Sequence, residues 1–412
     1  MTTSAQTVVR TEKYLTRQDA ILRAATGILN DKGLRGMTLG QVAERFGIVS
    51  TGVAYYFRSK EALASACFLQ AIEAHNRLIG EAMAGPTVAD RLSRLVESYF
   101  DLMRRIAVGE ADDIAHFDDL RALDDPATEA AYVDMFRHVR RLLDPNPGQR
   151  QDRVTLNARA HSLIQQLIFA RTWLRRYDPA DYARAGRRML DILLHGLGSE
   201  VRPWRAARLT MPGSATAQPD DPREVFLRAA TQLITEQGFR GASVERIAAR
   251  LEVTKGAFYY HIDAKDDLIE ICYARTAEVV RTTQQAADRV PADARDRLAA
   301  ALGHLVDHQL KGDVPLLRPA VTSLPDGMRQ RVTLVFERNG VRFGSMISDG
   351  IADRSLRPVD VQIATSMVNA TVNASAELAN WLPGAPDDRA TETFLRPLFE
   401  GLAPVEPRRT SG

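Results

Sequence analysis

The sequence has few cysteines, no long apolar run and almost no net charge. Cys67 and Cys272 are the only cysteines in 412 residues, so no disulfide framework is indicated and a reducing cytoplasm is expected. No stretch approaches the roughly 18 apolar residues of a membrane helix, and the first residues lack an apolar signal region, so we expect no membrane partner. The formal net charge of +2 argues against a nonspecific nucleic-acid coat protein. Any DNA binding would have to depend on a few placed residues.

The composition indicates a folded chain with more than one domain. Hydrophobic residues make up 45% and charged residues 26% of the sequence, which is ordinary for globular proteins. A length of 412 residues is too great for one ordinary core. Apolar residues recur at helical spacing, and no segment alternates apolar and polar residues for long. The sequence therefore predicts an all-α protein.

An internal duplication organises the chain. The run Phe226–Thr231 repeats Ile21–Thr26 almost letter for letter, 205 residues later in the numbering (226 minus 21). The same separation holds for the pairs Gly33/Gly238, Arg35/Arg240, Gly36/Gly241, Ala43/Ala248, Arg45/Arg250, Lys60/Lys265, Leu63/Leu268 and Cys67/Cys272. Matches at one separation over some fifty residues indicate two copies of one structural unit.

Each copy has the pattern of a helix-turn-helix. In the first copy Gly33 ends one helix, and Thr38 with Gln41 forms a capping-box pattern that begins the next. Gly47 breaks that helix, residues 50–56 form a short recognition helix, and Ser59 caps a longer one. A helix-turn-helix reads DNA by placing its second helix in the major groove.

The recognition helices need short or polar side chains for base edges and donors for phosphates. Lys60 and Lys265 each open the following helix, where the helix dipole disfavours a cation, which suggests a role toward phosphate. The candidate DNA-binding residues of the first copy are Thr38, Ser50, Thr51, Gly52, Tyr55, Tyr56 and Lys60. Those of the second copy are Ser243, Thr254, Lys255, Gly256, Ala257, Tyr259, Tyr260, His261 and Lys265.

Both copies resemble the DNA-binding domain of TetR/AcrR-family regulators. The resemblance lies in the run A-A-x-x-L/I-x-x-x-x-G-x-x-G-x-T/S, and in K-G-x-x-Y-Y-H followed by K-x-x-L, over residues 16–68 and 222–272. It implies two tandem units, each with a three-helix head that binds operator DNA and a helical body that binds a small effector and dimerises. It also implies that Ser243, Thr254, Lys255, Tyr259, Tyr260 and Lys265 contact DNA, with Thr38, Tyr55, Tyr56 and Lys60 matching less cleanly.

The two recognition helices differ in register. Tyr55 and Tyr56 match Tyr259 and Tyr260 at a separation of 204 residues rather than 205. We interpret this as one additional residue in the first turn and one fewer later, so the two heads should read unequal half-sites.

The expected domain boundaries follow from these units and from a Pro-rich, small-residue stretch between them. They are a flexible arm (1–15), a first head (16–62), a first body (63–200), a linker (201–221), a second head (222–268), a second body (269–404) and a tail (405–412).

Several other residue groups invite a functional interpretation. The stretch from Glu110 to Asp119 could hold a metal ion, but a solvated acidic stretch is the simpler interpretation. We interpret His304 with His308 as a polar helix face and the two cysteines as core residues rather than redox sensors. A third group, which could line a cavity but is interpreted as ordinary core, comprises Phe100, Phe117, Trp173, Phe343 and Trp381.

The chain is therefore predicted to be a transcriptional regulator, most simply a repressor released from its operator by a small hydrophobic or aromatic ligand. No clustered nucleophile, base or metal set indicates an enzyme, and no cofactor is expected. Two units in one chain suggest an intramolecular pseudo-dimer, with an ordinary homodimer as the other possibility. The alternative is a regulator in which only the second head binds DNA and the first serves as a partner or dimerisation module.

Overall fold

A computed structural model of the chain shows helices joined by turns. It describes residues 12–146, 152–200, 202, 209–211, 222–241, 243–254, 256, 265–311, 324–383 and 387–403. In these ranges the extended structure amounts to one isolated bridge between Gly198 and Leu356, which confirms the all-α prediction. None of the helices in these ranges has the length and apolar character needed to cross a membrane.

The first half of the chain contains eight described α-helices. They are α1 (Glu12–Gly36), α2 (Leu39–Phe46), α3 (Ser50–Tyr56), α4 (Lys60–Ala82), α5 (Val88–Ala107), α6 (Pro126–Leu142), α7 (Arg153–Leu174) and α8 (Tyr182–His195). The described helices of the second half are α9 (Pro222–Gly241), α10 (Val244–Arg250), α12 (Lys265–Ala287), α13 (Ala294–Lys311), α14 (Asp326–Ala352), α15 (Val361–Ala374), α16 (Leu378–Trp381) and α17 (Asp387–Glu400).

The duplication extends beyond the DNA-binding motif. Both ends of α12 lie 205 residues after those of α4, and both ends of α17 lie 205 residues after those of α8. For α7 and its counterpart the separation is 208, because the N-cap residues Asp152 and Asp360, and Trp173 and Trp381, correspond at that distance. Two complete units of similar construction therefore follow one another.

Local signals fix the helix ends of the first head. Gly33, with a φ of 69°, breaks α1 near its end, in the left-handed region that favours glycine. The Thr38 hydroxyl accepts a hydrogen bond from the Gln41 N–H at 3.2 Å, and the Gln41 side chain accepts one from the Thr38 N–H, also at 3.2 Å. Gly47 ends α2 with a φ of 73°. The capping box and the two glycine breaks are confirmed.

Two compact units divide the chain, and the first consists of residues Met1–Ala74 together with Asp112–Ala131. In it the acidic stretch before α6 is attached to α1. The Asn30 side chain donates to Asp113 Oδ2 at 2.9 Å and accepts from the His116 N–H at 2.9 Å, while Asp119 Oδ2 accepts from the Leu34 N–H at 2.6 Å. Glu110, Asp112 and Asp113 are exposed, in agreement with a solvated acidic stretch, and carboxylates of this stretch also bind the head. The described residues contain no cluster of three or more metal-binding side chains.

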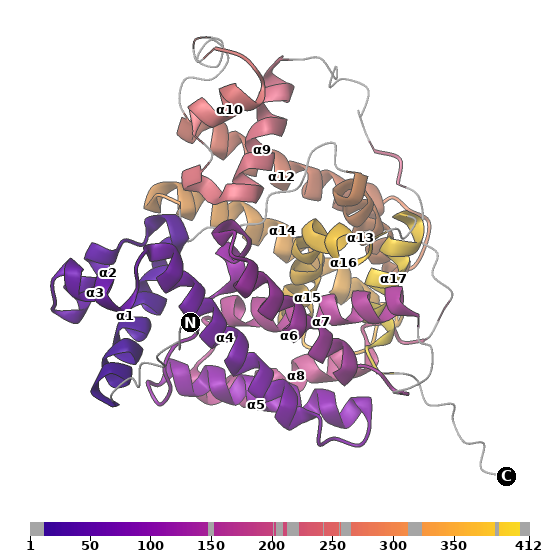
Figure 1. Cartoon of the computed structure of the whole chain (residues 1–412). Coiled ribbons are helices and arrows are strands. Elements are labelled where there is room, and N and C mark those ends of the chain that lie inside the picture. Colours follow the sequence, from indigo (N-terminus) through magenta and orange to yellow (C-terminus); the bar gives the residue numbers. More distant parts are fainter. Residues whose placement is uncertain are drawn as a thin grey trace, which may run out of the picture. The chain divides into compact units, whose positions relative to one another are not determined.

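The second unit contains residues His75–Ala111 and Tyr132–Gly412. At its centre α7 and α8 of the first half pack against α15 and α17 of the second half (Figure 1). Helix α7 is buried around most of its circumference. The second head belongs to this unit, because its core of Phe226, Ile247 and Tyr273 continues onto Met328 and Val332 of α14.

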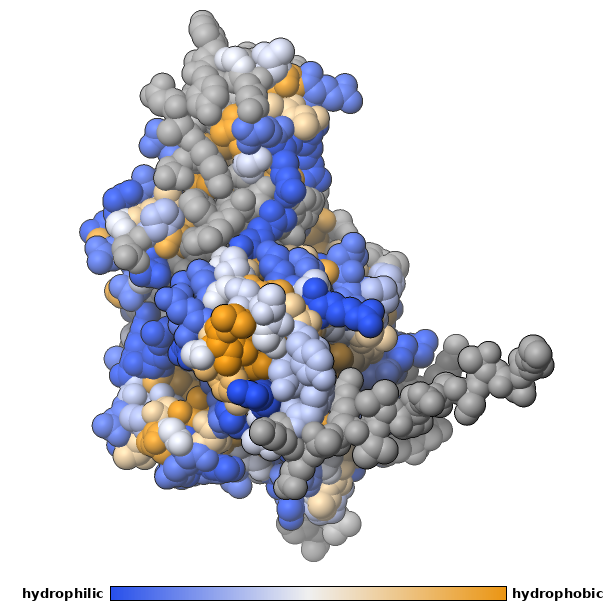
Figure 2. Space-filling model, turned by 60° about the vertical axis from the view of Figure 1, so that its left-hand side comes forward, coloured by the Kyte–Doolittle hydropathy of each residue, from blue (hydrophilic) through white to orange (hydrophobic). Residues whose placement is uncertain are grey.

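The surface is mostly polar on the face shown in Figure 2, where hydrophobic residues form small separate patches among hydrophilic ones. Among the described residues, the most exposed large apolar side chains are Tyr55, Val49 and Val341, at 73%, 71% and 70% exposure. Two of these three belong to the first head, at or beside α3.

Candidate functional site

The turn of the helix-turn-helix is built identically in the two heads. The Ile48 N–H donates to the Ala43 carbonyl at 2.9 Å, and the Val253 N–H donates to the Ala248 carbonyl at 3.0 Å. These two bonds correspond at 205 residues, so the first turn contains no additional residue, and our interpretation of an insertion was wrong. The two backbones keep one register, and the tyrosine pair of the first copy simply occurs at a different position along the recognition helix from that of the second copy.

The left-handed position of each turn carries different residues. It is Gly47 in the first head and Glu252, with a φ of 55°, in the second. A glutamate in this conformation costs about 1 kcal/mol relative to glycine. The first turn is therefore the less strained of the two.

The candidate DNA-binding residues of the first head lie mostly on its surface. Ser50 and Thr51 are exposed at the start of α3, Gly52 is half-buried, and Tyr55 projects from the end of the helix. Val49 is the N-cap of α3 and supplies no side-chain hydrogen bond. The N-terminal amides of α3 therefore have no side-chain cap.

An aromatic cluster supports the recognition helix of the first head. The Tyr14 ring from α1 lies 4.7 Å from the Tyr56 ring and 6.0 Å from the Tyr55 ring, centroid to centroid. The two tyrosines of α3 lie 5.2 Å apart, edge to face. Tyr14 precedes the repeated segment and shares no pattern with the second copy, so the sequence did not single it out.

Thr38 and Lys60 flank the recognition helix. Thr38 is exposed and caps α2. Lys60 is half-buried at the start of α4, and its Nζ lies 3.4 Å from the Leu34 carbonyl oxygen. The ammonium group therefore has an acceptor inside the head as well as any phosphate outside it.

In the second head the described candidates are Ser243, Thr254, Gly256 and Lys265. Ser243 is the N-cap of α10 and accepts a hydrogen bond from the Arg246 N–H at 3.4 Å. Thr254 and Gly256 are exposed, and Lys265 is the first residue of α12. The candidates Lys255, Ala257, Tyr259, Tyr260 and His261 lie outside the described residues.

A small apolar cavity lies inside the first body, between α4, α5, α6 and α7. Its volume is about 20 Å³, which is room for little more than one water molecule. It is lined by His75, Leu78, Ile79, Leu95, Tyr99, Met135, Val139, Ile164, Leu167 and Ile168. The Tyr99 hydroxyl donates to the Leu167 carbonyl at 2.7 Å, and burial raises its pKa to about 12. The cavity therefore favours hydrocarbon groups.

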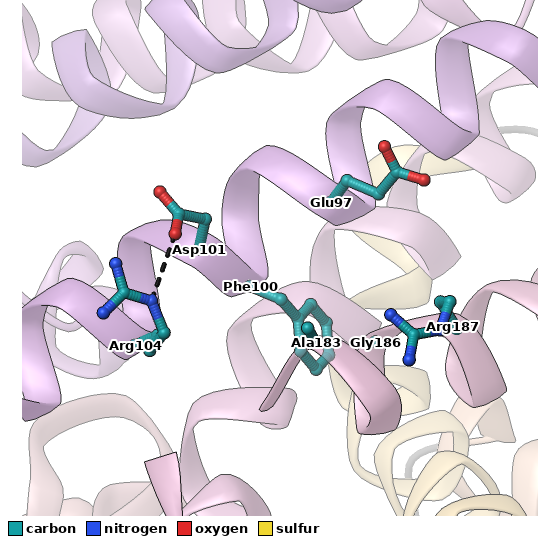
Figure 3. A pocket seen from close by; sticks show the side chains of 7 residues that line it. All are labelled: Glu97, Phe100, Asp101, Arg104, Ala183, Gly186 and Arg187. Carbon is teal, nitrogen blue, oxygen red and sulfur yellow. Dashed lines mark hydrogen bonds and ion pairs between the residues drawn. The ribbon is translucent and has the colours of Figure 1, made fainter. Parts of the chain in front are cut away.

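A second hollow, of about 150 Å³, lies between α5 and α8 (Figure 3). Phe100 of α5 faces Gly186 of α8, where an added Cβ would lie 2.8 Å from the Phe100 ring. Asp101 is bound to Arg104 at 3.2 Å. Phe100 therefore packs α5 closely against α8, and the charged side chains lie around this contact.

The remaining groups considered from the sequence are mostly structural. Cys67 and Cys272 are both buried, and burial raises the pKa of the Cys67 thiol to about 11. The rings of His304 and His308 stack with centroids 6.5 Å apart on α13. Both observations agree with the interpretation of these residues as parts of the core or of a helix face.

Comparisons with known proteins give the same match for both heads. The profile of the family described as bacterial regulatory proteins, tetR family, matches residues 21–67 and 226–272. The HTH-type transcriptional repressor DhaR of Mycobacterium sp. (strain GP1) is 26% identical over 141 residues, which is 33% of this chain and 70% of DhaR. The transposon Tn10 TetC protein of Escherichia coli is 38% identical over 48 residues, or 12% of this chain and 24% of TetC.

Solved structures align with about half of the molecule. Apo AibR is 19% identical with a TM-score of 0.37, and the alignment covers 43% of this chain and 98% of AibR. The regulator PfmR from Thermus thermophilus is 17% identical with a TM-score of 0.37, covering 43% and 99%. The two profile matches and the repeated helix bounds together show two tetR-type DNA-binding heads and two TetR-like units joined in tandem.

Proposed function

We propose that the chain is an operator-binding repressor that acts as an intramolecular pseudo-dimer, with the domain boundaries expected from its sequence. The observation that carries this proposal is the reciprocal pairing of its halves. The Leu197 N–H donates to the Leu398 carbonyl at 2.9 Å, and the Leu402 N–H donates to the Leu193 carbonyl at 2.7 Å. The two bonds are equivalent, because Leu402 is the counterpart of Leu197 and Leu398 that of Leu193 at the separation of 205 residues.

Such reciprocity defines an isologous interface, which normally joins two identical subunits. Glycines make this close contact possible. Gly196 and Gly401 correspond at 205 residues, and both have a positive φ, of 69° and 88°. A Cβ on Gly401 would lie 2.1 Å from the Leu194 carbonyl oxygen, and one on Gly196 would lie 2.2 Å from the Phe399 carbonyl carbon.

Ion pairs repeat the same arrangement at the helix starts. Asp152, the N-cap of α7, binds Arg389 of α17 at 2.7 Å. Asp360, the N-cap of α15, binds Arg188 of α8. Each half thus supplies an arginine from its last helix to the N-cap aspartate of the other half. The surface that other members could use for a second chain is occupied here by the chain itself.

Repression and its release by a ligand are supported by two observations. The relative DhaR is named a transcriptional repressor. The cavity of the first body is apolar and holds only about 20 Å³, so an apolar ligand that enters it must move α4 to α7 apart. Because α4 begins directly after the recognition helix of the first head, such movement would change that head. No part of this activity requires enzyme chemistry.

The mass of the protein in solution tests the pseudo-dimer. Light scattering at low concentration should give the mass of one 45.6 kDa chain. One chain should also bind one operator with two unequal half-sites in footprinting, because the recognition helices differ. A mass of two chains, or equal protection of a perfect palindrome, would refute this form of the proposal.

Variants of the recognition helices test the DNA-binding role. Lys255→Ala should weaken operator binding more than Ser50→Ala, because a lysine can neutralise a phosphate. Measuring both at several salt concentrations separates phosphate contact from folding, since losing one phosphate contact reduces the salt slope by about 1. Unchanged affinity of Lys255→Ala at physiological salt would contradict the assignment.

The alternative, in which only the second head binds DNA, is motivated by the different side chains of the two recognition helices. Mobility shifts with each head disabled in turn distinguish the two. If disabling the first head leaves affinity and footprint length unchanged, the alternative holds.

A further inference from the structure

The residue before the first recognition helix is an unusual choice for its position. Val49 is the N-cap of α3 and supplies no side-chain hydrogen bond. Serine, threonine, asparagine and aspartate are strongly preferred at an N-cap, and valine is among the poorest caps. The corresponding residue of the second head, 205 residues later, is Thr254, which is of the preferred kind. Val49 therefore does not serve the stability of its own helix.

Packing inside the head does not account for Val49 either. Its side chain is 71% exposed, so it contributes little to the core. The inward side of α3 is defined by Val53 and Phe57, which are 0% and 6% exposed. With capping and core packing both set aside, the role that remains for this apolar side chain is a contact outside the head.

The outward side of α3 carries only small apolar groups, hydroxyls and one aromatic ring. Ser50, Thr51 and Ala54 are exposed. Tyr55, near the end of the helix, is 73% exposed. Residues 47–57 contain no arginine, lysine, histidine, asparagine, glutamine, aspartate or glutamate. The recognition helix of the first head therefore presents neither a charge nor an amide to DNA.

This chemistry limits which bases the helix can distinguish. Bidentate hydrogen bonds to guanine come from arginine or lysine, those to adenine come from asparagine or glutamine, and carboxylates accept from cytosine. Serine and threonine hydroxyls bind several bases alike. The base feature left for an apolar side chain is the 5-methyl group of thymine, which lies in the major groove where a recognition helix is placed.

We propose that Val49 is a specificity-determining residue of the first head and reads the 5-methyl group of a thymine in its half-site. Thr254 offers a hydroxyl at the corresponding position, so the two half-sites should differ at the base pair that this residue faces. The proposal rests on the proposed function in treating the first head as a DNA reader. It deepens that function by giving a chemical basis for the unequal half-sites.

Selection from random DNA with the full-length protein gives an operator sequence without knowledge of the target genes. The selection is repeated with Val49→Ser, which removes both methyl groups, and with the matched control Thr254→Ser in the second head. The natural protein should select a thymine at one position where Val49→Ser no longer prefers it. Thr254→Ser should keep this thymine.

Uracil then tests the methyl group directly, because it differs from thymine only in lacking that group. Uracil at the selected position should weaken the binding of the natural protein and of Thr254→Ser about fourfold, which corresponds to one buried methyl group. In Val49→Ser the same replacement should have no measurable effect on affinity.

Thermal unfolding separates base reading from folding. Serine is a better N-cap than valine, so Val49→Ser should not lower the melting temperature. The salt dependence of binding should also stay the same, because no phosphate contact is removed. A lower melting temperature together with equally weakened binding to all sequences would show a structural role of Val49 and overturn the proposal.

Footprinting distinguishes failure of this proposal from failure of the proposed function. If both half-sites are protected but uracil binds as well as thymine at every position, Val49 does not read a methyl group. A uracil penalty in Val49→Ser as large as in the natural protein has the same meaning. Protection of one half-site only, unaffected by Val49→Ser, would overturn this proposal together with the two-headed form of the proposed function.

Discussion

Trp381 joins the two halves of the chain, and its removal should separate them. Its ring stacks on Phe136 of α6, with centroids 3.8 Å apart and planes inclined by 10°, and lies 6.2 Å from the His161 ring. The Asn157 amide of α7 donates to the Trp381 carbonyl at 3.0 Å. All three partners belong to the first half, whereas Trp381 belongs to the second.

The expected cost follows from this packing. Replacing a buried tryptophan by alanine costs about 3–5 kcal/mol. Trp381 is partly exposed, and its backbone bond to Asn157 survives the substitution, so we expect the lower end, about 3 kcal/mol. At 1.4 kcal/mol for each factor of ten, this corresponds to roughly a hundredfold weaker association of the halves.

Association can be measured after a protease site is introduced between Met211 and Pro222. The purified chain is cut, and the dissociation constant of the two halves is determined by dilution and native mass. Trp381→Phe, which keeps a ring for stacking, should lose no more than about tenfold. Val341→Ala, at a site 70% exposed, should have little effect. If Trp381→Ala weakens association less than threefold, the aromatic contact does not hold the halves together.

Three further predictions concern single residues. Cys67 should remain unmodified by iodoacetamide at pH 8 in the folded protein, because burial raises its pKa to about 11, and peptide mapping should find it labelled only after unfolding. The pKa of Asp125 is lowered by hydrogen bonds from the Thr128 and Ser65 hydroxyls, so this carboxylate stabilises the fold above its unfolded pKa and ceases to do so as the pH falls through its folded pKa. In Asp125→Asn the free energy of unfolding should therefore fall less steeply between about pH 5 and 2 than in the natural protein, and an unchanged pH dependence would count against this. Gly401→Ala should lower the free energy of unfolding in urea by roughly 2 kcal/mol or more, because the φ of 88° and the nearby Leu194 carbonyl both oppose a side chain. Gly80→Ala, at a site with open space around it, should not destabilise the protein, and equal effects of the two substitutions would contradict this.

The heads could be predicted from the sequence because their signals are local. A capping box spans four residues, a left-handed glycine acts at one position, and the bounds of α2 follow from both. The duplication was visible for the same reason, since the repeated residues could be compared without knowing what they touch. The one error in the turn came from aligning tyrosine letters, where the bond between Ile48 and Ala43 shows that the backbone keeps one register.

The contacts between distant segments were decided only by the tertiary structure. The sequence of the acidic stretch could not show that Asp119 binds the Leu34 N–H near the end of α1, and nothing around Trp381 indicates that its partner is Phe136. The same limit applies to the buried polar side chains of α12, whose letters alone do not reveal whether a partner is present. The sequence by itself determined two helical units with DNA-reading heads, because helices and turns are stabilised by residues within a few positions of one another. The pairing of the halves and the character of their interiors depend on which surfaces meet across some two hundred residues, and that was established by packing alone.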